Sequence, residues 1–485
     1  MSSRVAAMSA GRTSDATPDS WPPEHGPADV SIVCGAHLLR HLSLDTATVL
    51  KEHPVRVRPG IPGWPRGEFE ILATPLPGID SHGAAATFAT GLTEWGLVTW
   101  LDETSLGVAI SDDSPAWHNA MWWEFLDVVA RARQVPAPTW GVGLLGFGAI
   151  GAEHARAVAN TPGLTLAAVC DPNPVRVAAA QDGTPGLKAH LTPEDLFADP
   201  DVQVVIISTP PDSHARWAML ALEAGCHVVV EKPMAMTSHQ CDEILACAAR
   251  LGLSATVYQN RRFDPDYILI KETVTSGEIG EVFHVEAFVG GYSHPCNYWH
   301  SESSVSGGAL FDWGSHVIDQ VLDLIPGQVV AVSAINHKRV WHDVTNADHA
   351  RMTLIFDGGR EATFIYSDLA AALKPRWYVL GTHGALTGEW RRESIVMRNA
   401  IGTMDEDLLA PADAPPRISL HTPRGDVTTL MPSPRENYPF HADLVLSLTY
   451  GLPPRVLGEQ SRRVVAMLEA AEESARLGGI PVTPS

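Results

Sequence analysis

Asp312 and His316 are the first candidates for chemistry in this chain, because a carboxylate and an imidazole stand four residues apart. On a helix, side chains at this spacing share one face and can reach the same ligand. Such a pair can also belong to a metal site, but the sequence offers no third ligand at a suitable spacing. We therefore expect no metal and interpret the two side chains as part of a site for an organic ligand.

A second candidate is the run Gly146-Phe147-Gly148-Ala149-Ile150-Gly151, which has the GxGxxG pattern. The pattern also occurs in ordinary glycine turns, but here a strand-like apolar run (141–145) precedes it and a helical stretch follows it. The next apolar run ends at Asp171, twenty residues after Gly151. In dinucleotide-binding turns, glycines at these points let the pyrophosphate approach the N-terminus of the helix. The segment therefore predicts a nicotinamide dinucleotide site.

Asp171 bears on which dinucleotide binds. A carboxylate at this place accepts hydrogen bonds from the ribose hydroxyls and repels a 2′-phosphate, so the sequence favours NAD over NADP. Arg176, five residues further on, would relax this preference if it reached the ribose. A solvated position on a helix face is the simpler expectation for that arginine.

Two short motifs follow later apolar runs. Thr209-Pro210-Pro211 comes after the run 202–208, and Glu231-Lys232-Pro233 comes after the run 227–230. Open α/β sheets bind ligands at the carboxyl ends of their parallel strands. We therefore expect both motifs to lie at the edge of the sheet that carries the glycine turn.

The pattern of elements places these motifs in an α/β Rossmann domain (140–260), where near-continuous apolar strands alternate with helices and predict a parallel sheet. Longer strand-like runs separated by turns predict an α+β domain with a large, mainly antiparallel open sheet (261–458). A helical stretch (459–477) follows. Ahead of both domains, residues 1–29 suggest a disordered tail and 30–139 a small accessory α+β domain. Its expected elements are strands at 30–34, 55–57, 69–73 and 96–101 and an amphipathic helix at 117–133.

Composition narrows the classes of function. The chain has 485 residues, of which 56 are acidic and 34 basic, and its formal net charge is −22. A field of this sign repels phosphate backbones and anionic lipids, which argues against nucleic acid or membrane partners. The six cysteines are scattered, and the N-terminal tail has no apolar run suited to a signal peptide. We therefore expect a cytoplasmic protein with reduced thiols.

In these motifs the chain resembles the glucose–fructose oxidoreductase/inositol dehydrogenase (GFO/IDH/MocA) family from about residue 140 onward. GxGxxG, TPP, EKP and DxGxH occur in the family's order. The resemblance implies an oxidoreductase that moves a hydride between the nicotinamide of NAD (NADP as the lesser alternative) and a hydroxyl or keto carbon of a sugar, glycoside or cyclitol. It also implies a cis Lys232–Pro233 bond and a C-terminal helix (459–477) that returns to the Rossmann domain.

Carried over from the family, Lys232 and His316 form the proton-handling pair and Asp312 is their partner. Hydride leaves a carbinol only if the O–H proton leaves too, so an acid or base is needed beside the nicotinamide. A lysine that is partly desolvated near the nicotinamide cation can have its pKa lowered toward neutrality, and we expect His316 to titrate near neutral pH. The residues expected to contact the cofactor are Gly146, Phe147, Gly148, Ala149, Ile150, Asp171, Thr209, Pro210, Glu231, Lys232 and Asn260.

The segment 294–300 carries aromatic and hydrogen-bonding side chains that suit a polyol with apolar C–H faces. An ordinary loop packed on the sheet is the alternative interpretation. The residues expected to contact the substrate are Tyr298, Trp299, His300 and Trp313. We also expect a homo-oligomer that forms through the open sheet.

Two rival functions stay open. One is an NAD-using glycosidase of the same fold, which would hold its cofactor tightly and release no net NADH. The other is a non-catalytic nucleotide-binding sensor. Such sensors tend to lack the catalytic lysine or histidine, whereas Lys232 and His316 are both present.

Overall fold

The computed structural model describes residues 139–296, 298–390, 417–431, 437–450 and 454–485, together with the backbone of seven further strands. The chain divides into two compact units. One comprises Met1–Pro138 with Asp443–Arg455, and the other comprises Thr139–Ala442 with Val456–Ser485.

The strands described in the first unit are short and antiparallel. They are β1 (Val30–Gly35), β2 (Val55–Pro59), β3 (Glu68–Ala73), β4 (Val98–Leu101) and β5 (Leu106–Ala109). The first three pair in the order β1-β3-β2, and β4 pairs with β5. Strands thus occur near all four expected positions. The expected tail (1–29) and helix (117–133) lie outside the described residues.

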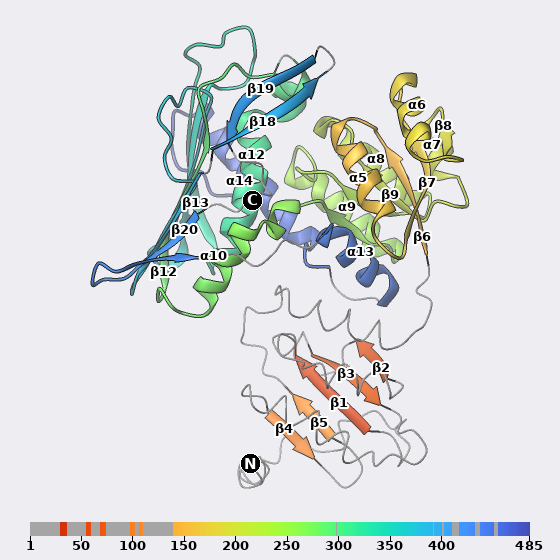
Figure 1. The fold of residues 1–485 in the computed structure, drawn as a ribbon, viewed down its shortest axis with the longest axis horizontal. Helices are drawn as coiled ribbons and strands as arrows, with labels where there is room; N and C mark the ends of the chain where they lie inside the picture. The colour runs from red at the N-terminus through yellow and green to blue at the C-terminus, as the bar shows by residue number, and fades with distance from the viewer. Residues whose placement is uncertain are drawn as a thin grey trace. The chain divides into compact units, whose positions relative to one another are not determined.

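The second unit begins with a six-stranded parallel sheet in the order β11-β10-β9-β6-β7-β8. Its helices alternate with its strands along the chain, and Figure 1 shows α5, α8 and α9 around the strands. The central strand β9 is buried along its whole length, as a parallel sheet covered by helices requires. The elements are β6 (Trp140–Leu145), α5 (Ala149–Ala159), β7 (Leu164–Cys170), α6 (Pro174–Gly183), β8 (Lys188–His190), α7 (Pro193–Phe197), β9 (Val204–Ile207), α8 (His214–Glu223), β10 (His227–Val230), α9 (Ser238–Leu251) and β11 (Ala255–Val257).

An eight-stranded sheet follows in the order β13-β14-β15-β12-β16-β17-β20-β21. Its one parallel pair joins β12 to β15, so the expectation of a mainly antiparallel sheet is confirmed. The elements are α10 (Pro265–Thr275), β12 (Val282–Gly290), α11 (Ser303–Ser306), α12 (Ala309–Leu324), β13 (Val329–His337), β14 (His349–Phe356), β15 (Glu361–Ser367), β16 (Trp377–Gly381), β17 (Ala385–Glu389), β20 (Arg417–His421) and β21 (Val427–Leu430). A separate hairpin pairs β18 (Arg392–Asn399) with β19 (Gly402–Leu409).

Helix α12 covers one face of this large sheet because its sequence is apolar on the facing side. On β14, Met352, Leu354 and Phe356 are buried and alternate with more exposed residues. They share one core with Leu310 and Val317 of α12. The alternation is what a half-covered antiparallel sheet requires. The packing fixes α12, and with it Asp312 and His316, on the sheet.

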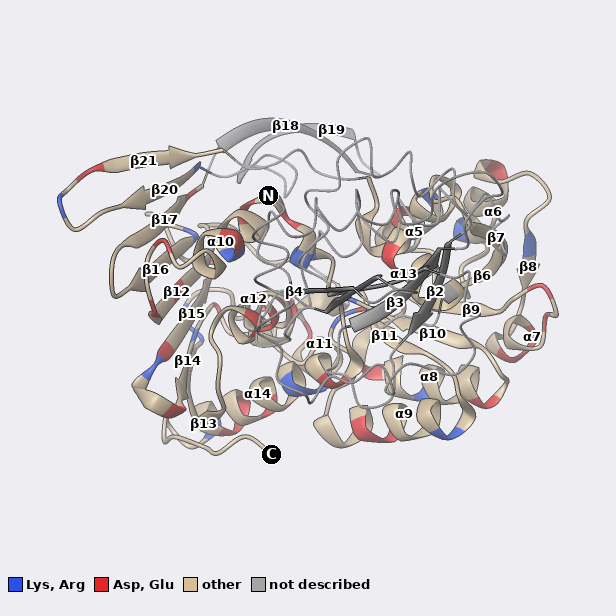
Figure 2. Ribbon diagram, turned by 90° about the horizontal axis from the view of Figure 1, so that it is seen from below, with Lys and Arg blue, Asp and Glu red and all other residues tan. Residues whose placement is uncertain are grey.

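Helix α14 (Gly458–Arg476) links the two sheets of this unit. It packs on α12 and β13 of the large sheet and on α9 of the parallel sheet. Arg462 pairs with Asp242 of α9 at 2.9 Å, and Glu469 accepts a 2.6 Å hydrogen bond from the backbone of Ser238. Figure 2 shows α14 beside β13, with acidic and basic residues spread along the helices.

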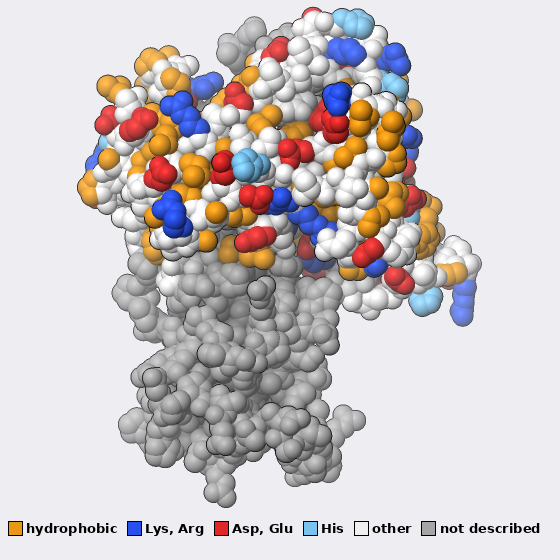
Figure 3. Space-filling model, turned by 180° about the vertical axis from the view of Figure 1, so that it is seen from behind, with side chains coloured by type: hydrophobic (Ala, Val, Ile, Leu, Met, Phe, Trp, Pro, Cys, Tyr) orange, Lys and Arg blue, Asp and Glu red, His pale blue; other side chains and the backbone are white. Residues whose placement is uncertain are grey.

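The surface of the described part carries charges of both signs among apolar side chains, as Figure 3 shows for one face. None of the described helices is long and apolar enough to cross a bilayer.

Candidate active site

The glycine turn between β6 and α5 is shaped for close approach of a ligand. Gly146 has φ +93°, and a Cβ there would lie 2.6 Å from the Ser208 carbonyl oxygen. A Cβ on Gly151 would lie 2.4 Å from the Gly146 oxygen. Beside Gly148, the N-cap of α5, a Cβ would meet no atom within 4 Å. The turn therefore leaves open space in front of the free N–H groups that begin α5, and this fits a pyrophosphate.

Asp171 lies against this turn at the end of β7. Its Oδ2 accepts a 2.7 Å hydrogen bond from the Phe147 N–H, and its Oδ1 accepts one of 2.7 Å from the Asn173 N–H. Arg176 approaches the same carboxylate at 3.5 Å, while about half of its own side chain stays exposed. These contacts place the Asp171 carboxylate and the Arg176 guanidinium next to the glycine turn, where the ribose attached to the pyrophosphate would lie. The residues present fit a nicotinamide dinucleotide.

The structure brings the lysine of one motif to the aspartate of another. Lys232 Nζ donates a 2.5 Å hydrogen bond to Asp312 Oδ1 and a 3.2 Å hydrogen bond to the Asp312 carbonyl oxygen. Burial alone would raise the pKa of Asp312, but the Lys232 ammonium outweighs it and holds that pKa below its ordinary value. Asp312 is therefore a carboxylate at neutral pH. The Lys232–Pro233 bond is cis, as the resemblance implies.

His316 lies one turn further along α12 and is buried. Its Nδ1 has no hydrogen-bond partner among the residues that the structure describes. Burial, together with the positive charges of Lys232, Arg261 and Arg376, holds the pKa of His316 well below 6.5. The expectation that this histidine titrates near neutral pH is therefore wrong. The ring is a neutral imidazole, because burial beside several cations disfavours the imidazolium.

The segment 298–300 lies near the same pair of charges. Trp299 stacks on His300 with ring centres 3.6 Å apart, and Tyr298 is largely exposed. Burial lowers the pKa of His300, with Asp312 opposing and Lys232 adding to that shift. Trp313, also expected to contact the substrate, packs against an arginine. The guanidinium carbon of Arg261 lies 4.4 Å from the centre of its ring.

The remaining expected contacts lie at the strand ends. Thr209 shares a 2.7 Å hydrogen bond with Ser213, and Pro210 begins the short turn after β9. Glu231 is buried directly after β10, and Asn260 begins the turn that follows β11.

Two residues that the sequence reasoning did not single out belong to this neighbourhood. Tyr366, on β15, donates a 2.8 Å hydrogen bond to Asp368 just beyond the strand. Burial and the nearby negative charges of Asp348 and Asp312 raise the pKa of Asp368 to about 6. The sequence does show polar side chains directly after an apolar strand, a pattern that can indicate a site. No local pattern indicates, however, that the end of this strand lies near Asp312.

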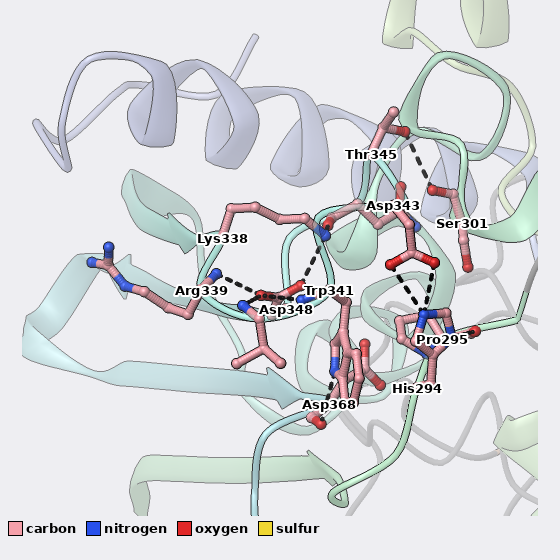
Figure 4. Close-up of polar contacts among 12 residues, drawn as sticks. His294, Pro295, Ser301, Lys338, Arg339, Trp341, Asp343, Thr345, Asp348 and Asp368 are labelled. Atoms are coloured by element: carbon pink, nitrogen blue, oxygen red, sulfur yellow. Dashed lines mark hydrogen bonds and ion pairs between the residues drawn. The ribbon is translucent and has the colours of Figure 1, made fainter.

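The loop 338–348, between β13 and β14, is folded around one buried carboxylate (Figure 4). Asp348 is 0% exposed and accepts hydrogen bonds from Lys338 Nζ (2.8 Å) and from the backbone N–H groups of Arg339 (2.5 Å) and Val340 (2.6 Å). The loop holds Trp341 against the His294 ring, with centres 4.8 Å apart.

The same loop supports the segment near the Lys232–Asp312 pair. Asp343 pairs with His294 at 2.9 Å, and Asn346 donates a 2.8 Å hydrogen bond to the His300 carbonyl oxygen (Figure 4 shows the first of these contacts). The loop therefore ties His300 to β13 and β14.

Replacing Asp348 by asparagine should destabilise the protein. Burial opposes the charge of Asp348, but the hydrogen bonds from Lys338 and the backbone prevail and lower its pKa from 3.8 to about 2. A carboxyl group whose pKa is lower in the folded than in the unfolded protein stabilises the fold at pH values above its unfolded-state pKa. This stabilisation is lost as the pH falls through the folded-state pKa. The difference corresponds to about 2 kcal/mol. Chemical denaturation at pH 7 and near pH 2 measures it: the gap between wild type and Asp348→Asn should close at the lower pH. The exposed Asp182→Asn is the control, and an equal gap at both pH values would contradict the assignment.

Within the part of the chain that the structure describes, no group of three or more His, Cys, Asp or Glu side chains is arranged to hold a metal ion.

Comparison with known proteins agrees with this geometry. Residues 140–259 match the GFO/IDH/MocA oxidoreductase family model with an NAD-binding Rossmann fold, and residues 267–387 match the GFO/IDH/MocA C-terminal domain. The uncharacterized oxidoreductase YdgJ of Escherichia coli is 32% identical over 246 residues, which cover 50% of this chain and 69% of YdgJ. The scyllo-inositol 2-dehydrogenase (NADP(+)) IolW of Bacillus subtilis is 29% identical over 291 residues, or 58% of this chain and 79% of IolW.

A solved structure shows the same fold. The NAD-binding protein from Listeria innocua is 31% identical, superposes with a TM-score of 0.60, and is covered over 97% of its length by 71% of this chain. The chain is thus a Rossmann-fold oxidoreductase. It belongs to the GFO/IDH/MocA family, and the resemblance drawn from the four motifs is confirmed.

Proposed function

We propose that this protein is an NAD-linked dehydrogenase or ketoreductase of a sugar, glycoside or cyclitol. The observation that carries the proposal is the 2.5 Å bond between Lys232 of the Rossmann domain and Asp312 of α12, with the buried His316 one turn away. A cation and a neutral imidazole that come together beside a dinucleotide turn suit the removal of a proton from a hydroxyl group.

Each residue then has a distinct task. A nicotinamide bound at the glycine turn would supply the hydride acceptor for the carbinol carbon, or the hydride donor for the carbonyl. Neutral His316 takes the hydroxyl proton as the C=O bond forms, since its lowered pKa leaves a ring nitrogen free at neutral pH. Lys232 donates a hydrogen bond to the same oxygen and stabilises its developing negative charge, while Asp312 orients the ammonium. In reduction the proton moves back from His316 to the oxygen.

The neighbouring side chains favour a substrate with several hydroxyl groups. Trp299 and His300 offer stacked rings, and Tyr366 with Asp368 offers hydroxyl and carboxylate groups. Aromatic faces pack against the C–H faces of a sugar ring, and polar groups bind its hydroxyls. A panel of sugars, glycosides and cyclitols, monitored by NADH absorbance, tests the proposal. Absence of any NADH change across the panel would contradict the proposal. Glycoside cleavage without NADH release would support the alternative of an NAD-using glycosidase instead.

For the cofactor, we expect NAD to bind more tightly than NADP, by on the order of 1–3 kcal/mol, because Asp171 binds ribose hydroxyls and repels a 2′-phosphate. Arg176 opposes this preference, since it lies 3.5 Å from the same carboxylate. Titration of both cofactors by protein fluorescence measures the difference.

Two variants sharpen this measurement. Asp171→Ala should narrow the gap between the cofactors, and Arg176→Ala should widen it. An NADP preference in the wild type would rule the assignment out. The exposed Asp195→Asn should change neither affinity.

Assembly and location belong to the proposal as well. On the large sheet, Ile355 and Tyr378 are exposed on the face opposite the core, which supports pairing with a second copy. The described cysteines are free thiols, which suits the reducing cytoplasm. Light scattering during gel filtration tests the oligomer.

A further inference from the structure

The turn Glu231-Lys232-Pro233 is held on both sides by buried histidines that the proposed chemistry does not use. His154 lies on α5, and His214 begins α8; both are 0% exposed. His154 Nε2 lies 3.0 Å from Glu231 Oε1, and His214 Nδ1 lies 2.8 Å from the Pro233 carbonyl oxygen. One histidine therefore holds the residue before the lysine, and the other holds the residue after it.

On the Glu231 side, the contacts form a chain. The second carboxylate oxygen of Glu231 accepts a 3.1 Å hydrogen bond from the Lys232 backbone N–H. His154 Nδ1 lies 3.0 Å from Nε2 of His441, which is itself 0% exposed. A carboxylate only accepts, so His154 donates to Glu231 from Nε2, and the contact between His154 Nδ1 and His441 Nε2 extends the chain to a third buried side chain. Burial, with His154 adding to it, holds the pKa of His441 well below 6.5, so His441 is neutral.

On the Pro233 side, one ring joins two motifs. His214 Nε2 lies 2.8 Å from the carbonyl oxygen of Thr209, so the imidazole bridges the ends of β9 and β10. Both neighbours are acceptors, so the ring donates to one of them when neutral and to both when protonated. Burial lowers the pKa of His214, although the two carbonyls and the charges of Glu231 and Asp212 oppose that shift.

A fixed turn matters because Lys232 acts at a distance from its backbone. Its ammonium reaches Asp312, eighty residues further along the chain, at the end of four flexible side-chain bonds. Catalytic groups need to be held to within about 0.5 Å, and the residues that orient them supply this precision.

We propose that His154 and His214 are positioning residues for Lys232. They hold the backbone of the turn so that the ammonium meets Asp312 and the substrate oxygen together. This inference rests on the proposed role of Lys232 and extends it to two fully buried residues that hold its backbone.

Turnover of matched variants tests the role. His154→Leu and His214→Leu should each lower kcat by roughly 10–100-fold, the usual cost of losing an orienting partner, with a much smaller change in KM and in NAD affinity. His154→Gln should recover most of the loss, because its amide N–H can reach the place of Nε2. His239→Leu, at an exposed site on α9, should have no effect.

A double-mutant cycle separates positioning from general damage. In a Lys232→Ala background, the histidine variants should cost almost nothing more, because the group that they position is gone. Losses of the same size in both backgrounds would overturn the inference. If Lys232→Ala itself leaves turnover intact, the proposed catalytic role of Lys232 is wrong. The positioning role of His154 and His214 is then wrong as well.

A measurement without cofactor or substrate completes the test. The chain has only six lysines, namely Lys51, Lys188, Lys232, Lys271, Lys338 and Lys374. After reductive ¹³C-methylation, the Lys232 resonance can be assigned by its loss in Lys232→Arg. It should shift in His154→Leu and His214→Leu and stay in place in His239→Leu. If a leucine variant does not fold, Glu231→Gln and His214→Gln give the same comparison. An unmoved Lys232 resonance in folded variants would overturn the inference.

Discussion

Replacing Lys232 by alanine is expected to lower turnover by about 10²–10⁴-fold, the usual cost of removing a positioned acid/base or charge-stabilising group. The ammonium donates to Asp312 and is 18% exposed, so it can also reach a substrate oxygen. NAD affinity should change little, because the glycine turn and Asp171 lie on other segments. Steady-state NADH absorbance and fluorescence titration of NAD measure the two effects.

The controls for Lys232 separate charge from geometry. Lys232→Arg keeps the positive charge but replaces a compact ammonium with a planar fork, so it should recover only part of the rate. Lys374→Ala removes a surface lysine that pairs with Glu286 and should leave turnover unchanged. Near-normal turnover in Lys232→Ala would remove this residue from the mechanism.

His316→Ala is the second substitution from which we expect a loss of about 10²–10⁴-fold, since it removes the proposed base. The pH profile gives the sharper result. A base whose pKa is lowered keeps its neutral form to lower pH, and burial with three nearby cations lowers the pKa of His316 well below 6.5. The rate of alcohol oxidation by the wild type should therefore show no decline at pH 6.5 from this group, and any acidic limb due to it should appear at lower pH.

Profiles of kcat/KM against pH for the wild type and His316→Ala test this directly. The exposed His342→Ala should keep the wild-type profile and rate. A decline of wild-type kcat/KM near pH 6.5 that disappears in His316→Ala would show that His316 titrates with an ordinary histidine pKa. Burial would then not lower the pKa of this residue.

The sequence by itself determined the parts of this protein that depend on local pattern. GxGxxG between an apolar run and a helical stretch, with Asp171 twenty residues later, is enough to predict the dinucleotide turn, because glycine conformation and helix N-termini act over a few residues. Alternating strands and helices predicted the parallel sheet, and the spacing of Asp312 and His316 predicted that they share a face of α12.

Only the tertiary structure decided what these groups do to one another. Lys232 and Asp312 are eighty residues apart, and His154 and His441 are 287 apart, so no local pattern indicates that either pair meets. The neutral state of His316 depends on burial and on cations from distant segments, and a sequence contains neither quantity. The loop around Asp348 and the Tyr366–Asp368 pair were missed for the same reason. Hydrogen-bond partners and electrostatic fields depend on distances in space, which the packing of α12 and α14 on the large sheet sets.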